Sequence, residues 1–363
     1  MFTLPEYIQP DFSLPAFGAA PCVHTVTAPR DGLLPDNFYA TTIYPEYFKI
    51  NDRWALINAP RMDCAVVVRN GMPYATEARR VLKGDEIVVG RTEDLSNGVF
   101  INYDAFQESD SESKAQSFAF RTGKSRESSY SRDYDQLYEI LRHDREHGSI
   151  VWVLGPAVAF DYDARRSMSG LIEHGYVDAL FAGNALATHD LEAGLFHTGL
   201  GQDIYTKELA YNGHYHHLET INRVRNAGSI ESFVARQDMK NSIIASCVKK
   251  NTPFVLAGSI RDDGPLPGVI GNVYEAQDAM RSHIMKATTV IALATQLHTI
   301  ATGNMTPSWQ ISENRLRPVY FYNVDISEFA VGKLHDRGSL SVNSIVTNVQ
   351  DFLINAARSL GVI

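Results

Sequence analysis

Two stretches of the chain, VDALFAGNA at residues 177–185 and PFVLAGS at residues 253–259, share one pattern that decides the fold. Each is a short apolar run that ends in Ala-Gly, followed by a small polar residue and then by a polar loop with charged side chains. Buried parallel strands have such continuous apolar runs, and open α/β sheets bind ligands just beyond the carboxyl ends of their strands. With His189 and Arg261 in the two loops, the pair predicts a ligand site and an enzyme.

From about residue 133 onward, strand and helix patterns alternate. The expected strands are 150–154, 177–182, 253–257, 319–324 and 344–346. The expected helices are 135–147, 164–174, 216–227, 231–250, 275–301, 326–335 and 349–359. The long helix 275–301 rests on apolar residues at helical spacing from Ala276 to Ala301. Because alternating strands and helices build parallel sheets, we predict an α/β fold with a doubly wound, Rossmann-like parallel sheet.

The first part of the chain is expected to be mostly β-structure. Short strand patterns cover 53–58, 63–69 and 86–90, and Asn70-Gly71 is a strong hairpin signal. Eight serines stand among charged residues between 107 and 131, which indicates a surface connection or, alternatively, a mobile lid. The predicted domains are therefore a smaller β-rich N-terminal domain at 1–105, a Ser-rich connection at 106–132, and an α/β domain at 133–363.

Composition excludes several classes of protein. The 363 residues are 44% hydrophobic and carry a net charge of -9, without the long Lys/Arg run that a nucleic-acid footprint needs. No apolar run approaches the roughly 18 residues of a membrane helix, and the N-terminus is not a signal peptide. Three widely spaced cysteines suit a reducing compartment, so we expect a cytoplasmic protein without nucleic-acid or membrane partners.

The evidence for a dinucleotide is divided. Asp325, at the end of the expected strand 319–324, is placed to accept hydrogen bonds from ribose hydroxyls, but it suits a helix N-cap equally well. No G-x-G-x-x-G occurs, and the nearest stretch, 199–204, lacks the third glycine. A bound dinucleotide would have to be cradled by the loops at 183–185 and 302–305.

The loop RDDGPLP at 261–267 suits an amino-acid substrate, because Asp262 could hold an ammonium group and Arg261 a carboxylate. A solvated turn is the alternative. Six histidines lie between 174 and 217, but no H-E-x-x-H or Cys/His quartet is present, so no metal site is expected. Structural or acid–base histidines are favoured instead.

Several stretches together resemble the archaeal-type ornithine cyclodeaminases, also called lysine-oxoglutarate reductase/saccharopine dehydrogenase conserved-region proteins. The same module forms the carboxyl half of the cyanobacterial arginine dihydrolase–ornithine cyclodeaminase. The matching stretches are 38–42, 62–64, 83–90, 175–192, 213–218, 254–267, 298–307 and 333–339. This sequence departs from the family at Ala159-Phe160-Asp161, where a His-Thr-Gly-like stretch is usual, at Thr41-Thr42-Ile43 in place of Thr-Thr-Asn, and at Asn348 in place of Asp.

The resemblance implies a dinucleotide domain like that of deoxyhypusine synthase, with tightly held NAD. The cofactor contacts that it implies are Asn184, Ala185, Asp263, Thr302, Gly303, Asn304, Met305, Asp325, Asn348 and Val349.

The resemblance further implies an NAD-dependent ornithine cyclodeaminase, which converts L-ornithine to L-proline and ammonia by an internal hydride cycle. From position, we expect Asp190 or His189 to transfer protons, Arg261 to anchor the carboxylate and Asp262 to contact an ammonium group. One alternative is a net NAD(P)-dependent dehydrogenase of the amino-acid, opine or saccharopine kind, and another is a non-catalytic NAD-binding module. The only partners expected are the small-molecule amino-acid substrate and further copies of the chain, as a dimer or tetramer.

Overall fold

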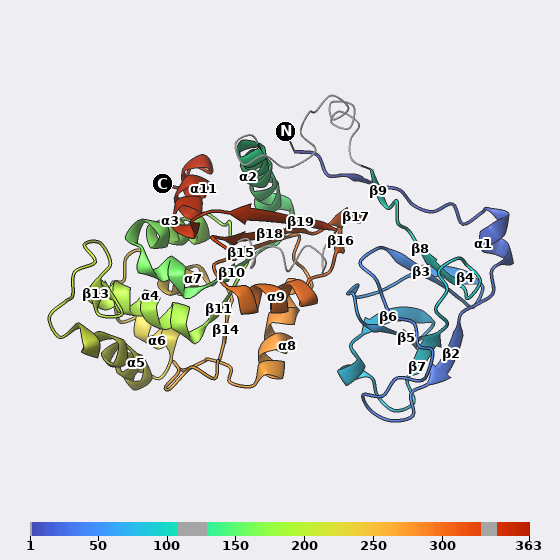
Figure 1. Ribbon diagram of the computed structural model, residues 1–363, viewed down its shortest axis with the longest axis horizontal. Coiled ribbons are helices and arrows are strands. Elements are labelled where there is room, and N and C mark those ends of the chain that lie inside the picture. The colour runs from blue at the N-terminus through green and yellow to red at the C-terminus, as the bar shows by residue number, and fades with distance from the viewer. Residues whose placement is uncertain (1, 108–128, 328–339) are drawn as a thin grey trace.

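A computed structural model describes residues 2–107, 129–327 and 340–363. The chain forms a larger α/β part, at the left and centre of Figure 1, and a β-rich N-terminal part at the right. Most of the Ser-rich connection 106–132 and of the expected helix 326–335 lies outside the described residues. The domain boundaries stay a prediction.

Six parallel strands form the central sheet, in the order β14-β11-β10-β15-β18-β19. Their bounds are β10 (Ile150–Leu154), β11 (Ala179–Gly183), β14 (Phe254–Ala257), β15 (Thr289–Leu293), β18 (Tyr320–Asp325) and β19 (Ser341–Val346). This order is that of the doubly wound Rossmann sheet, so the predicted fold class is confirmed. The finer likeness to deoxyhypusine synthase stays a prediction.

Alternate residues of the strands enter two separate cores. Trp152 and Leu154 of β10 pack in the larger core, and Val151 and Val153 pack in the smaller one on the other face. The larger core contains residues of α2 (Ser129–His147), α3 (Tyr162–Glu173), α4 (Asn184–Phe196), α5 (His216–Ala227), α6 (Ile230–Val234), α7 (Ile243–Lys250) and α11 (Val349–Ser359). The smaller core contains residues of α8 (Val273–Ile284) and α9 (Gln296–Met305). Both faces of the sheet are therefore buried, which explains the continuous apolar runs.

Three sequence expectations were wrong in detail. The expected helix 275–301 is α8, then the buried central strand β15, then α9, because a short fully buried strand can match helical spacing by chance. The expected helix 231–250 is broken into α6 and α7, and Ser242 caps the second of these. The expected polar loop after β11 is the start of α4, which is buried along most of its length.

The N-terminal part contains a four-stranded and a three-stranded antiparallel sheet. The first comprises β2 (His24–Thr27), β7 (Glu86–Val89), β5 (Ala65–Arg69) and β6 (Met72–Thr76), and the second β4 (Arg53–Leu56), β3 (Glu46–Ile50) and β8 (Val99–Ile101). β1 (Glu6–Tyr7) pairs with β9 (Phe106–Gln107). The β5–β6 hairpin turns at Asn70 and Gly71, which have φ angles of 52° and 74°, as the sequence predicted.

The two parts of the chain are in direct contact. Trp309, in the hairpin of β16 (Trp309–Ser312) and β17 (Arg315–Pro318), is buried in the core of the N-terminal part. Arg61 donates a hydrogen bond to the carbonyl oxygen of Asn304 at 2.8 Å and pairs with Glu77, which also pairs with Arg281 of α8. Within the described ranges, every helix is too short or too polar to cross a membrane.

Candidate functional site

The sheet reverses its strand order at β10, which lies between β11 and β15. At the carboxyl end of this strand, the amide of Gly155 donates to the carbonyl oxygen of Leu293 at 2.8 Å. A Cβ on Gly155 would lie only 1.9 Å from the carbonyl oxygen of Ala294, which itself has a left-handed φ of 50°. Doubly wound sheets bind ligands at such a reversal of strand order, and left-handed backbone at a non-glycine residue is often found at functional sites.

Two helices begin at this edge with open N-termini. Gly183 precedes α4 and Thr295 precedes α9, and neither residue makes a side-chain cap within the described chain. Side chains do cap α3, α7, α8 and α11, from Asp161, Ser242, Asn272 and Asn348. Because uncapped amides at a helix N-terminus favour anions, the starts of α4 and α9 can hold phosphate groups.

Asn184 joins the two strand ends that the sequence analysis singled out. Its Oδ1 accepts a hydrogen bond from the amide of Leu266 at 3.0 Å, and its Nδ2 lies 3.5 Å from Oδ1 of Asp262. The other oxygen of Asp262 accepts from the amide of Ser259 at 2.8 Å. The loop after β14 is thus tied to the first residue of α4. Arg261 and Asp263 are exposed on this loop, and Ala185 is half-buried in the first turn of α4.

His298, in the first turn of α9, lies against the same edge. A Cβ at residue 183 would be 3.1 Å from Cε1 of His298, so the glycine leaves room for the imidazole ring. Burial lowers the pKa of His298, and the nearby Asp262 carboxylate partly opposes this shift. His298 does not stand out in the sequence as a site residue, because only the fold brings α9 beside β11.

Asp325 and Asn348 lie at the carboxyl ends of β18 and β19. Oδ1 of Asp325 accepts from the amide of Ser327 at 2.9 Å, and Oδ1 of Asn348 caps α11 through the amide of Gln350 at 2.8 Å. Val349, which follows, is buried. Since neighbouring strands are about 4.8 Å apart, β11 and β18 are separated by about 14 Å. An extended dinucleotide can bridge this span, whereas a single amino acid cannot.

The segment from Thr302 to Met305 forms the second half of α9. Met305 packs in the smaller core, Gly303 is buried, and the carbonyl oxygen of Asn304 binds Arg61. The Thr302 hydroxyl is buried and has no hydrogen-bond partner within the described part of the chain. An unsatisfied buried hydroxyl is costly, so Thr302 fits a ligand that supplies a hydrogen bond.

Asp190 is fully buried and both of its carboxylate oxygens are engaged. Oδ1 accepts from Arg165 Nε and from the amide of Ile243, both at 3.0 Å. Oδ2 accepts from the Ser242 hydroxyl at 2.6 Å and from the amide of Ile244 at 2.9 Å. These bonds attach α4 to α3 and α7. Of the two residues expected to transfer protons, the geometry therefore favours His189 over Asp190.

His189 belongs to a group of three side chains from α4 and α5, which we call the His–Glu–His cluster: His189, Glu192 and His217. Oε2 of Glu192 lies 3.3 Å from His189 Nδ1 and 3.7 Å from His217 Nδ1. Burial acts to raise the pKa of Glu192, but the two histidines and donors from Gly201 and Thr198 lower it to about 2. The buried carboxylate is therefore ionised. Glu192 and His217 do not stand out in the sequence as site residues, because only the packing of α5 against α4 brings His217 to Glu192.

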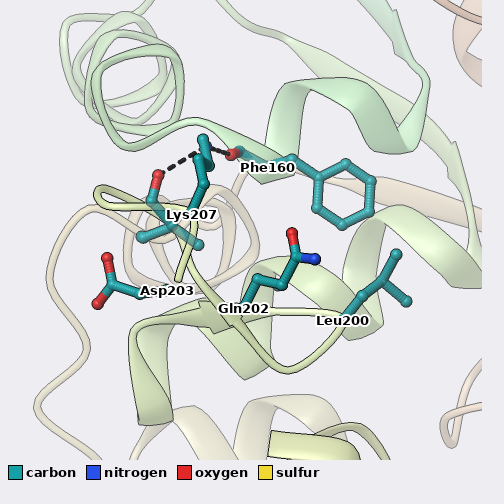
Figure 2. Close-up of a pocket in the computed structure, with 7 residues that line it drawn as sticks. Phe160, Leu200, Gln202, Asp203 and Lys207 are labelled. Atoms are coloured by element: carbon teal, nitrogen blue, oxygen red, sulfur yellow. Dashed lines mark hydrogen bonds between the residues drawn. The ribbon is translucent and has the colours of Figure 1, made fainter. Parts of the chain in front are cut away.

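A cavity of about 240 Å³ adjoins this region (Figure 2). Its lining residues are Phe160, Gly199, Leu200, Gln202, Asp203, Ile204 and Lys207. Lys207 Nζ donates to the carbonyl oxygens of Phe160 at 2.8 Å and Ile204 at 2.7 Å, as the dashed lines show. The ring centroids of Phe160 and His189 are 4.8 Å apart, so Phe160 contacts both the cavity and the cluster. Phe160 is also one of the departures from the family pattern.

The fold defines a Rossmann-type α/β protein, with a candidate ligand site at the reversal of strand order. Two sequence models of known families match the chain. "Arginine dihydrolase ArgZ-like, C-terminal, Rossmann fold" matches residues 135–356, and "Arginine dihydrolase ArgZ-like, C-terminal, first region" matches residues 45–132. The chain belongs to this ArgZ-like C-terminal family.

Individual relatives agree with the family. The chain is 39% identical to "Ornithine cyclodeaminase" of Methanopyrus kandleri, over 98% of this chain and 84% of that protein. A crystal structure of an LOR/SDH protein from Methanococcus maripaludis S2 is 36% identical, with a TM-score of 0.81 over 94% of this chain and 98% of that one. The ternary complex of AgrE with ornithine and NAD⁺ is 32% identical, with a TM-score of 0.58 over 96% of this chain but 47% of that one.

Proposed function

We propose that the protein is an NAD-dependent ornithine cyclodeaminase that converts L-ornithine to L-proline and ammonia. The observation that carries the proposal is the edge of the sheet where α4 and α9 begin without side-chain caps. Asn184 and His298 lie in the first turns of these two helices. A relative of 32% identity binds NAD⁺ and ornithine, and relatives of 36–39% identity are called ornithine cyclodeaminases, which supports the same ligands here.

In this proposal the chain's own residues bind and orient both ligands. The open helix N-termini hold the pyrophosphate of NAD, while Asp263, Asp325, Asn348 and the segment 302–305 contact the rest of the cofactor. Bound NAD would supply a reversible acceptor for the Cα hydride of ornithine, so that loss of ammonia and ring closure would require no net oxidation. Thr302 offers its unpaired hydroxyl.

Ornithine binding requires opposite charges and an accessible proton acceptor. Arg261 is exposed beside the edge and is our candidate for the substrate carboxylate, with Asp262 for an amino group. We assign proton transfer to the region of the His–Glu–His cluster rather than to Asp190. The chain must also hold ornithine coiled, so that its δ-nitrogen reaches Cα.

The direct test is ammonia release from L-ornithine by the purified protein, with and without added NAD⁺. Proline and NADH are followed in the same reaction. Equal amounts of ammonia and proline without lasting NADH are expected for a cyclodeaminase. Lasting NADH would support the net dehydrogenase instead. NAD binding without turnover of any diamino acid would support the non-catalytic module.

We also propose a cytoplasmic homo-oligomer. The three cysteines all lie in described ranges and are unpaired, which suits a reducing compartment. Six large apolar side chains between residues 200 and 218 are each at least 58% exposed, and a second copy would cover them. They are Leu200, Tyr205, Leu209, Tyr211, Tyr215 and Leu218. Light scattering coupled to size exclusion tests this, and a monomer at micromolar concentration would contradict it.

A further inference from the structure

We propose that the His–Glu–His cluster binds a divalent transition metal ion, and that zinc suits it best. The two imidazoles and the carboxylate come from α4 and α5 and form a compact group. Two histidines and a glutamate are a common donor set for zinc. The proposal concerns metal binding alone, so it does not depend on the ornithine activity.

The two carboxylate–imidazole distances are close to those of tetrahedral coordination. With bonds of about 2.0 to 2.1 Å, the ligand atoms of a tetrahedral zinc site lie about 3.3 Å apart. Oε2 of Glu192 is 3.3 Å from Nδ1 of His189 and 3.7 Å from Nδ1 of His217. All three ligand atoms lie within 4.8 Å of one another. The His189–Glu192 pair is within hydrogen-bond range, whereas the 3.7 Å pair exceeds it, so a single proton does not join all three groups.

Hydrogen bonds to one oxygen of Glu192 fix the carboxylate so that its other oxygen faces the two histidines. Oε1 of Glu192 accepts hydrogen bonds from the Thr198 hydroxyl at 3.0 Å and from the amide of Gly201 at 3.1 Å. These bonds leave Oε2 directed at the two histidines, as outer partners commonly do for metal ligands. Nδ1 of His217 is buried and makes no hydrogen bond to any described residue. Within the ranges that the structure describes, this ring nitrogen therefore has no protein partner that would compete with a cation.

The site has an entry path and an open position. The side chain of His217 is 36% exposed, whereas those of His189 and Glu192 are buried. Solvent therefore reaches one side of the cluster, and three protein ligands leave a fourth tetrahedral position for water. The ring of Phe160 closes another side against His189. The sequence motifs failed to predict this site because the ligands are not on one helix, apart from the His189–Glu192 pair.

The test titrates chelator-stripped protein with Co²⁺ and follows the visible absorption of tetrahedral cobalt, then displaces it with Zn²⁺. One ion per chain is expected, and Zn²⁺ should remove the absorption. Glu192→Gln and His217→Gln should each weaken Co²⁺ binding by more than about tenfold. His214→Gln is the matched control, because His214 is exposed and lies three residues before His217.

Two results would overturn the proposal. One is the absence of any cobalt absorption in the wild-type protein, after circular dichroism has shown that the protein is folded. The other is equal loss of binding in His214→Gln and His217→Gln, which would mean adventitious binding to surface histidines. His217→Gln is the variant less prone to misfolding, because the His217 side chain is partly exposed and the buried Glu192 stays in place.

Discussion

Arg165 and Asp190 form an ion pair that is closed to solvent. Nε of Arg165 donates to Asp190 Oδ1 at 3.0 Å, and Nη2 donates to the carbonyl oxygen of Asp190 at 2.9 Å. Their side chains are 2% and 0% exposed. Removing one partner of a buried pair leaves the other charge without compensation. The pair therefore joins α3 to α4 as a structural element.

Asp190→Asn should accordingly lower the free energy of unfolding by about 3 to 5 kcal/mol. Urea unfolding followed by circular dichroism measures this, with the exposed Asp238→Asn as control, which should change it by less than about 0.5 kcal/mol. Unchanged stability of Asp190→Asn together with lost turnover would contradict this structural role and return Asp190 to the catalytic candidates.

Gly155→Ala should distort the edge where the strand order reverses. The new Cβ would lie 1.9 Å from the carbonyl oxygen of Ala294, so the two backbones must separate. We expect a loss of about 1 to 3 kcal/mol in stability and weaker NAD binding, measured by urea unfolding and calorimetry. Gly18→Ala is the control, because its Cβ would meet nothing within 4 Å. Unchanged NAD affinity in Gly155→Ala would place the cofactor elsewhere.

The sequence predicted the sheet well where strands are flanked by turn signals. The strand at 150–154 was predicted at its observed bounds, ending before Gly155-Pro156. The central strand β15 was missed, because Val290 and Ile291 also fit the helical spacing of their neighbours. The preceding pair Thr288 and Thr289 is β-branched and favours a strand.

The candidate site was predictable only for residues that directly follow the end of a strand. Asn184 and Asp262 each follow an apolar run, and the parallel sheet brings them to one edge. The contacts of His298 and His217 depend on how helices pack, which no local pattern specifies. His189 and Asp190 were left as alternatives because adjacent residues on a helix point in different directions. Only the neighbours of α4 show that the Asp190 carboxylate is fully hydrogen-bonded.

Glu46 should make the protein less stable as pH rises through the weakly acidic range. Burial raises its pKa from an ordinary 4.5 to about 7, despite hydrogen bonds from Thr42 and Tyr39. Between these pH values the unfolded chain has released the proton while the folded chain keeps it, so the free energy of unfolding falls with pH. The stabilisation is complete below pH 4.5 and is lost by about pH 7.

Glu46→Gln cannot titrate, so the stability of the variant should change less between pH 5 and pH 8. The difference between the two proteins is expected to reach about 3 kcal/mol over this range. Urea midpoints at the two pH values measure it. Parallel pH profiles for the two proteins would mean that Glu46 is ionised in the folded state throughout.

Asn184→Ala should weaken both the fold and NAD binding. The substitution leaves the buried amide of Leu266 without its acceptor and releases the loop after β14 from α4. A buried donor without a partner costs about 1 to 3 kcal/mol of stability. The freed loop should in addition raise the Kd for NAD by about tenfold, which corresponds to about 1.4 kcal/mol. Calorimetric titration of NAD measures this.

The matched control for Asn184→Ala is Asn102→Ala in the N-terminal part. Both asparagines are 7% exposed, and Nδ2 of Asn102 donates to the carbonyl oxygen of Ile8 at 2.8 Å. Asn102→Ala should therefore lose a similar amount of stability while it keeps the wild-type affinity for NAD. An equal loss of affinity in both variants would show that NAD binding responds to general destabilisation, and the assignment of Asn184 to the cofactor site would then fail.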